Sequence, residues 1–436
     1  MRRRELLAGL AAAFTLPALP LRAGDGITAE AVVHDWYRLI LELVRHTPTY
    51  SPPVASRAFG HVGLTLFEAL AARPESGLLS LAGQVNALPP CAALPAGLDP
   101  AAVAHGALCK AVGSFFGNTG PTGQRAMAAM QRRMEERLTT TLGAEALTAG
   151  QRAGEQVFDH ILAFSATDGG AVVENMGFPL KLDLPAGPGK WVPTSLVRQQ
   201  QMPLLPDWGK NRTFAADTAN CTLSAPTEYS EDPSSAFHAE AMEVYLAVKN
   251  RTPEQELIAR FWSDDPMLSP TPPGHWIFIA LDVLEGEAAP VERRAEVLAL
   301  LGMAVADAFV ACWQSKYEFN TLRPVTYIKA HIDKTWEPIL NTPPFPEFPS
   351  GHSTQSGAAA AVLTHLFGDN YAFEDRTHED EGFDPRPFPS FNAAAEEAGI
   401  SRLYGGIHFM PAIKMGLEQG RCVGGHINRL NTRKEA

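Results

Sequence analysis

Apolar residues recur every three to four positions along most of this 436-residue chain, and two-residue alternation is almost absent. A period near 3.6 lines one face of a helix, whereas a half-exposed strand needs a period of two. The pattern therefore predicts an all-α protein, a multi-helix bundle of two packed four-helix-bundle-like units with long irregular loops and few or no strands. Helices are expected over residues 28–46, 54–72, 99–115, 127–142, 147–164, 234–249, 253–263, 277–285, 291–315, 353–367, 392–403 and 411–430.

A long irregular stretch, residues 165–232, interrupts this pattern and is rich in Gly, Pro, Asn and Thr. Loops of this length inside a compact domain usually cover a functional region. We expect an N-terminal helical region over residues 24–290 that includes this loop. A C-terminal helical region over residues 291–436 should pack against it to form one integrated domain.

The composition is that of a globular protein, with 45% hydrophobic residues, 19% charged residues and a net charge of −12. This profile excludes a disordered or fibrous chain. The acidic balance gives no basic stripe for nucleic acid, so no nucleic-acid partner is expected. The sequence leaves the oligomeric state open, a homo-oligomer included.

The N-terminus is typical of a twin-arginine signal peptide over residues 1–23. Arg3 and Arg4 begin an Arg-Arg-x-Leu-Leu pattern, an apolar run follows to Leu19, and Ala23 ends a plausible cleavage site. A membrane anchor is the alternative, but the run is short and broken by proline. We expect export to the periplasm or beyond, with no membrane span after removal of the signal.

Five cysteines are present, and none has the spacing of a zinc or haem site. An exported protein can pair them. Cys91 and Cys109 are the closest pair in sequence and are expected to form the bridge. Cys312 and Cys422 lie in apolar helical segments, and we expect them to be buried as small hydrophobic residues.

Lys316 and Arg323 form the first block of chemically informative residues, followed by Pro324. Seven residues apart on one helix, the two cations would lie near the same face, two turns apart. A solvated basic pair is the usual interpretation, but apolar segments flank both residues here. Because an unpaired buried cation is unfavourable, the pair predicts an anion.

The second block is Pro349-Ser350-Gly351-His352, which ends a proline-rich approach over residues 341–349. Prolines favour an extended chain, and Ser350 is a good N-cap for the helix that follows. A helix N-terminus with a free glycine N–H favours an anion. A capping serine and a packed histidine are the alternative for this block alone.

The third block places Ser401 and Arg402 before a pair of glycines and then His408. The glycines allow a sharp junction, across which Arg402 and His408 can converge. Pro411 suits the first turn of the next helix.

Together the three blocks resemble the signature of the type 2 phosphatidic acid phosphatase superfamily, which includes the vanadium-dependent haloperoxidases and bacterial acid phosphatases. That signature reads Lys-x6-Arg-Pro, Pro-Ser-Gly-His and Ser-Arg-x5-His-x3-Asp. Flanking segments, such as Thr271-Pro-Pro-Gly-His-Trp276, are similar to exported bacterial members of the haloperoxidase branch.

The resemblance implies a site for vanadate or phosphate, both tetrahedral oxyanions. Lys316, Arg323, Ser350, Gly351 and Arg402 would bind its oxygens. His408 would bind vanadium at an axial position, or form a phosphohistidine in a phosphatase. His352 would act as general acid and base.

The lead interpretation is a vanadate-dependent haloperoxidase that oxidises a halide with hydrogen peroxide and passes it to an organic acceptor. An acid phosphatase that hydrolyses phosphate esters in the same pocket, with no cofactor, is the enzymatic rival. A non-catalytic oxyanion-binding protein is the third interpretation. Ala412 supports it, because the signature has an aspartate there to orient the axial histidine; a backbone carbonyl is the expected substitute.

Trp262, His275 and Trp276 are candidates to line the pocket.

Overall fold

The computed structural model describes residues 26–434. Within that range the chain forms thirteen α-helices and two short strands, β1 (Phe373–Asp375) and β2 (Arg386–Phe388), which pair antiparallel with Phe373 opposite Phe388. The predicted all-α class is confirmed. The predicted signal peptide, residues 1–23, lies outside the described residues.

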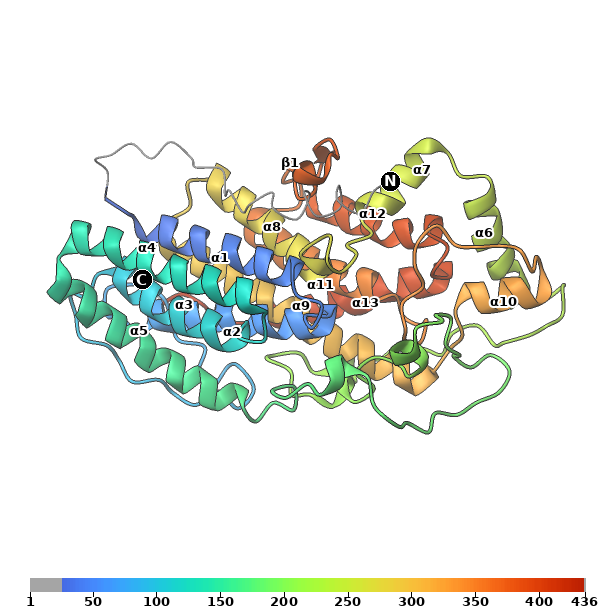
Figure 1. Cartoon of the computed structure of the whole chain (residues 1–436), viewed down its shortest axis with the longest axis horizontal. Coiled ribbons are helices and arrows are strands. Elements are labelled where there is room, and N and C mark those ends of the chain that lie inside the picture. The colour runs from blue at the N-terminus through green and yellow to red at the C-terminus, as the bar shows by residue number, and fades with distance from the viewer. Residues whose placement is uncertain (1–25, 435–436) are drawn as a thin grey trace, which may run out of the picture.

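Five helices gather at one end of the molecule, shown in blue to green in Figure 1. Several begin with a proline in the first turn, where its missing N–H removes no helical hydrogen bond. α2 packs on α3 and α3 packs on α5. The five are α1 (Ala29–Arg45), α2 (Pro52–Ala71), α3 (Pro100–Phe115), α4 (Pro121–Leu142) and α5 (Ala144–Ser165).

The central element is α9 (Val291–Phe319), which packs on α2 on one side and on α11 and α13 on the other. Gly63 of α2 and Gly302 of α9 allow the two helices to pack closely, since a Cβ at either would lie 2.7 Å from a carbonyl oxygen of the other helix. α9 begins at Val291, where the long helix was predicted to begin. By length and composition α9 is the one described helix that could span a membrane, and its apolar window is entirely buried inside the protein.

The other end of the molecule is built mainly from the C-terminal helices (Figure 1). α11 packs extensively on α13 and also contacts α12 and α9. The remaining helices are α6 (Ala236–Lys249), α7 (Pro253–Phe261), α8 (Thr271–Gly286), α10 (Pro324–His331), α11 (Gly351–Phe367), α12 (Phe391–Tyr404) and α13 (Met410–Ile427).

Three helices differ most from the sequence prediction. α4 begins at Pro121 and α8 at Thr271, each six residues earlier than predicted, because the prolines at their starts fall in the first turn, where they are tolerated. α10 was not predicted at all; it starts directly after Arg323, again with a proline in the first turn.

The long stretch 165–232 contains only short 3-10 turns among its described elements, as predicted. Asp307 of α9 fastens it to the core. The Asp307 carboxylate accepts three backbone N–H groups, from Phe214 at 2.6 Å, Ala215 at 2.9 Å and Ala216 at 2.8 Å.

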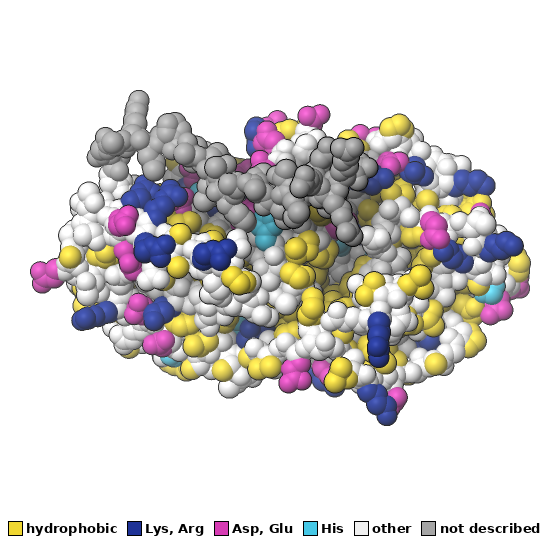
Figure 2. All heavy atoms as spheres, in the orientation of Figure 1, with side chains coloured by type: hydrophobic (Ala, Val, Ile, Leu, Met, Phe, Trp, Pro, Cys, Tyr) yellow, Lys and Arg dark blue, Asp and Glu magenta, His cyan; other side chains and the backbone are white. Residues whose placement is uncertain are grey.

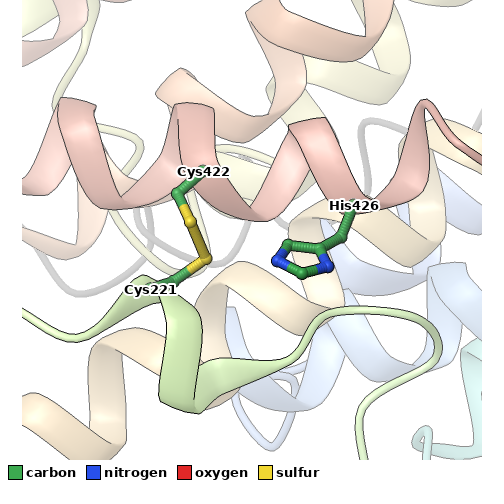
Figure 3. A group of neighbouring side chains, drawn as sticks. All are labelled: Cys221, Cys422 and His426. Atoms are coloured by element: carbon green, nitrogen blue, oxygen red, sulfur yellow. A yellow bond between two sulfur atoms is a disulfide. The ribbon is translucent and has the colours of Figure 1, made fainter.

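The predicted Cys91–Cys109 bridge is wrong. Cys221, in the long loop, is bonded to Cys422 of α13, while Cys91, Cys109 and Cys312 are free (Figure 3). The prediction that Cys422 is a simple buried residue is therefore also wrong, whereas Cys312 is buried as expected. His426 lies beside the bridge, but both sulfurs are already bonded to each other, so this group is not a metal site.

Candidate active site

Ser350 and Gly351 mark the start of α11 at the centre of the candidate site. Ser350 is the N-cap, and its Oγ accepts the N–H of Ser353 at 3.3 Å. The Ser350 N–H donates to the carbonyl of Ala412 at 3.0 Å, which ties the start of α11 to α13. The first turn of α11 therefore directs its partial positive charge into the site.

Lys316, in the last turn of α9, holds the proline-rich approach in place. Its Nζ donates to the carbonyl oxygens of Pro346 at 2.9 Å and Glu347 at 2.8 Å, and also to that of Pro349. All three ammonium donors thus have a backbone partner. Burial lowers the pKa of Lys316 to about 7. The side chain lies over the rings of Trp313 and Phe345.

Arg323 reaches the same region by a different route from the one predicted. α9 ends at Asn320, whose left-handed backbone (φ 51°) turns the chain, and Arg323 is the N-cap of α10. The two cations therefore do not share a helix face; the turn between two helices brings them together. Arg323 Nε donates to the carbonyl of Phe345 at 3.0 Å, and Nη1 donates to that of Ile407 at 2.9 Å.

Arg323 also keeps unused donor capacity inside the protein. Its Nη2 is buried and has no hydrogen-bond partner, and Nη1 lies 3.1 Å from Nε2 of His408. Buried polar groups are normally paired, so an unpaired guanidinium nitrogen indicates a missing acceptor. An anion beside His408 would provide it.

His408 is oriented by a carboxylate that the sequence analysis missed. Its Nδ1 lies 2.8 Å from Oε1 of Glu347, which also accepts the backbone N–H of Phe409 at 3.0 Å. Nδ1–H therefore donates to Glu347, and Nε2 is left with its lone pair toward Arg323. Glu347, rather than the expected backbone carbonyl, takes the role of the aspartate that Ala412 replaces.

Arg402 and His352 form another wall of the site, close enough to His408 to affect its pKa. Arg402, on α12, donates through Nε to Ser401 Oγ at 2.9 Å and through Nη2 to the carbonyl of Trp262. The same carbonyl is a hydrogen-bond partner of the His352 ring. His352 Nε2 is buried without a partner and lies 3.8 Å from Oδ2 of Asp264.

The electrostatics of the site favour an anion. Burial lowers the pKa of His408 well below its ordinary value, and the charges of Arg323, Lys316 and Arg402 lower it further. Burial also lowers the pKa of each arginine to about 10. Three buried cationic side chains around one neutral imidazole form a binding site for an oxyanion.

The three candidate pocket-lining residues are all fully buried. Trp262 contributes its carbonyl to Arg402 and donates Nε1–H to Glu397 at 3.0 Å. Trp276 donates Nε1–H to Ser356 of α11 at 2.9 Å. His275 contacts carboxylates behind His352 rather than the oxyanion-binding residues.

Comparison with known proteins identifies the family. The family model of the VCPO second helical-bundle domain matches residues 296–434, the range that carries all the candidate site residues. A solved bacterial vanadium-dependent iodoperoxidase is 33% identical, with a TM-score of 0.85, and the match covers 94% of this chain and 99% of that one. The chain belongs to the vanadium haloperoxidase-like family.

Two further proteins are similar to this chain. Vanadium chloroperoxidase from Curvularia inaequalis is 27% identical over 196 residues, which cover 37% of this chain and 32% of that protein. The match thus spans about a third of the length of the curated relative. A holo-type bacterial vanadium-dependent chloroperoxidase, 16% identical with a TM-score of 0.66 over 89% of this chain and 93% of that one, shares the fold.

Proposed function

We propose that this family member is an exported, vanadate-dependent haloperoxidase that oxidises a halide with hydrogen peroxide. The observation that carries the proposal is that the two ring nitrogens of His408 face different groups. Glu347 fixes its Nδ1–H at 2.8 Å, and its Nε2 faces Arg323, whose Nη2 lacks a partner. A tetrahedral oxyanion that accepts a lone pair from nitrogen satisfies both groups.

The donor set fits vanadate. His408 Nε2 would be its nitrogen ligand, and Arg323, Lys316 and Arg402 would neutralise its oxygens. Ser350 O–H and the Gly351 N–H would add neutral donors at the start of α11. Bound vanadate would supply the electrophilic centre at which peroxide oxidises a halide.

His352 is placed to move protons in this reaction. Burial and the charge of Arg402 lower its pKa well below the ordinary value, so the ring is neutral near pH 7 and can accept a proton. Its Nε2 is unpartnered. His352 Nε2 would therefore be the atom that accepts a proton from hydrogen peroxide and gives it back to form the leaving water molecule.

An acid phosphatase is the alternative that the same pocket supports. The Glu347–His408 hydrogen bond would equally fix the tautomer of a nucleophilic histidine. Phosphate esters would then occupy the oxyanion position, and His352 would protonate the leaving alcohol.

Parallel activity assays distinguish the two reactions. Purified protein is loaded with orthovanadate and assayed for halogenation of a phenolic dye with peroxide, beside hydrolysis of nitrophenyl phosphate. Iodide is the first halide to test, because the 33%-identical relative is described as an iodoperoxidase. Vanadate-dependent halogenation is expected, and phosphate release that vanadate inhibits, without halogenation, would replace the proposal with the phosphatase.

Substitution of His408 tests the site itself. His408→Ala should abolish whichever activity is present, while His365→Ala, an exposed residue of α11, should leave it unchanged. Full activity in His408→Ala would contradict the site assignment. Binding of vanadate by the wild type, without either activity, would favour the non-catalytic protein.

Export is a separate part of the proposal and rests on Arg3, Arg4 and the apolar run that follows. Expression of the full chain should give a mature protein outside the cytoplasm that begins near residue 24. Replacement of Arg3 and Arg4 by lysine should retain it in the cytoplasm. Unchanged export would contradict the twin-arginine route.

A further inference from the structure

A second cluster of titratable side chains lies behind His352, outside the oxyanion site. We call it the Asp264 cluster, and its members come from the loop after α7, from α8, from the end of β1, and from the segment between β1 and β2. All but one of its side chains are at most 3% exposed. The members are Asp264, His275, Asp375, His378 and Glu381.

We propose that Asp264, His275 and His378 bind one divalent transition-metal ion, with zinc as the probe. The three residues offer ligand atoms that all lie within 4.8 Å of one another. Oδ1 of Asp264 is 3.0 Å from Nδ1 of His275 and 3.2 Å from Nε2 of His378. Neighbouring ligands of a tetrahedral zinc ion bonded at about 2.0–2.2 Å lie about 3.3–3.6 Å apart, so a shift of a few tenths of an ångström in these side chains would admit the ion.

In each histidine of this site, the ring nitrogen that does not face Asp264 lies beside a second carboxylate. Nε2 of His275 lies 2.7 Å from Oδ2 of Asp375, and Nδ1 of His378 lies 3.2 Å from Oε1 of Glu381. Metal-binding histidines almost always donate their other ring N–H to a carboxylate, carbonyl or water. Each ring therefore directs one nitrogen toward Asp264. Its other nitrogen lies beside a carboxylate, which is the arrangement found for metal-binding histidines.

The charges of the Asp264 cluster also match a divalent cation. Its three carboxylates carry three negative charges, and Arg45 pairs with Glu381 at 3.2 Å. With both imidazoles neutral, as metal ligands must be, two negative charges remain uncompensated within the cluster. One divalent ion balances them, and without it the balance requires a proton on both ring nitrogens of each histidine.

Aromatic rings pack on both histidines of the cluster, which opens to solvent only at Glu381. Trp262 stacks on the His275 ring with centroids 4.4 Å apart, and Phe261 lies edge-on to both histidines. Uncompensated carboxylates in such an apolar shell are unfavourable. Two imidazoles and one carboxylate suit zinc and ferrous iron, and solvent would complete the coordination.

The proposed metal would share a residue with the wall of the oxyanion site. Oδ2 of Asp264 lies 3.8 Å from His352 Nε2, while Oδ1 faces the two histidines. Metal binding would therefore fix the position of Asp264, which in turn faces His352. The metal would act as a positioning group for that wall and not as a participant in the reaction.

Elemental analysis of the wild-type protein provides the test. The mature chain, with any affinity tag removed, is dialysed and its zinc, iron, manganese and vanadium contents are measured. About one divalent metal per chain is expected, independent of the vanadium content. Chelator treatment followed by zinc should raise the melting temperature of the wild type.

Conservative variants locate the metal. His378→Gln and Asp264→Asn should reduce the retained zinc at least about tenfold and remove the rise in melting temperature. The matched control His426→Gln, beside the disulfide, should retain the wild-type zinc content. Retention of zinc by both ligand variants would overturn the assignment.

The wild-type measurement decides the question even if the variants fail to fold. Less than about a tenth of an equivalent of any divalent metal, together with no response of the melting temperature to added zinc, would overturn the proposal. The cluster would then be a pair of protonated histidines held by three carboxylates. A loss of halogenation with zinc still bound would count against the proposed function alone.

Discussion

Glu347 is the acidic residue through which the proline-rich approach acts on His408. Its Oε1 accepts hydrogen bonds from His408 Nδ1 and from the N–H of Phe409. Burial raises the pKa of Glu347 to about 7, while the charges of Arg323 and Lys316 oppose the rise. The two cations therefore keep the Glu347 carboxylate ionised. The carboxylate in turn keeps the proton of His408 on Nδ1.

Replacement of Glu347 by glutamine should weaken vanadate binding by about 10–100-fold, because groups that orient a metal-binding histidine typically contribute that much. Glutamine keeps the size of the side chain but removes its charge. The dissociation constant of vanadate is the primary measurement. The ¹⁵N chemical shifts of His408 report which ring nitrogen carries the proton.

Glu337→Gln is the matched control for this substitution, since Glu337 is an exposed residue that pairs with Lys329 in the same half of the molecule. It should bind vanadate like the wild type. Equal affinities in Glu347→Gln and wild type would show that His408 is oriented by something else.

Most candidate site residues could be predicted because the sequence immediately around each of them indicates its role. Ser350 caps a helix that its own sequence signals, and the glycines before His408 mark a junction. Glu347 was missed because its effect on His408 spans 61 residues. One signal was present: Glu347 is the only charged residue of the approach 341–349.

At the scale of elements, α9 supports both the site and the covering loop. Lys316 lies in its last turn, and Asp307, nine residues earlier, binds the backbone of residues 214–216. The Asp307 carboxylate is fully buried and accepts three N–H groups. The long loop is therefore anchored to the same helix that anchors the proline-rich approach.

Asp307→Asn should destabilise the protein by about 2–4 kcal/mol, because the amide nitrogen cannot accept the backbone N–H groups that it would face. Unfolding in denaturant measures the loss, and limited proteolysis should show cleavage within residues 165–232. Asp183→Asn, an exposed position of the same loop, is the control and should change neither. Proteolysis confined to other segments would show that Asp307 does not anchor this loop.

Helix positions were largely predictable from periodicity, and the exceptions share one physical cause. Proline in the first turn of a helix is compatible with the helix, so Pro272 and Pro324 begin α8 and α10 instead of interrupting them. The placement of Lys316 and Arg323 on one helix face failed for a related reason. Asn320, which has a left-handed backbone conformation, ends α9 between the two cations. The spacing of apolar residues in this segment does not indicate that the helix ends there.

His61 of α2 makes stability depend on pH. Burial lowers its pKa to about 4, although Asp168, 2.9 Å away, opposes this. Between about pH 6.5 and 4 the unfolded chain binds a proton that the folded chain does not, so stability falls as pH falls through this window. The contribution of His61 is up to about 3 kcal/mol.

His61→Gln should therefore give a shallower loss of stability between pH 7 and pH 4.5, measured by denaturant unfolding at each pH. Glutamine can still donate an N–H to Asp168 but does not titrate. Burial also lowers the pKa of His105 to about 4. His105 should therefore preserve part of the dependence of stability on pH in the variant. His365→Gln should retain the full slope, and an unchanged slope in His61→Gln would contradict the assignment.

At the scale of the whole molecule, charge and covalent connection act over long distances. Lys and Arg are interspersed with Asp and Glu on the face shown in Figure 2, in keeping with the acidic overall balance. The disulfide joins the long loop to α13 across 201 residues. Sequence spacing could not predict this pairing, because it depends on which elements pack together, and the two cysteines nearest in sequence are both free.

Removal of this disulfide should destabilise the protein more than any single loop substitution. Closing a loop of this length restricts the unfolded chain, and its loss in Cys221→Ser/Cys422→Ser lowers the free energy of unfolding by up to about 5 kcal/mol. Denaturant unfolding measures the change. Wild-type protein treated with a reductant should match the double variant.

The double variant Cys91→Ser/Cys109→Ser is the control, since both of its thiols are free in the structure. It should unfold within about 0.5 kcal/mol of the wild type, and reductant should destabilise it as much as the wild type. Thiol titration of unfolded wild type should give three free thiols before reduction and five after. A large effect of this control, with none for Cys221 and Cys422, would restore the pairing suggested by sequence distance.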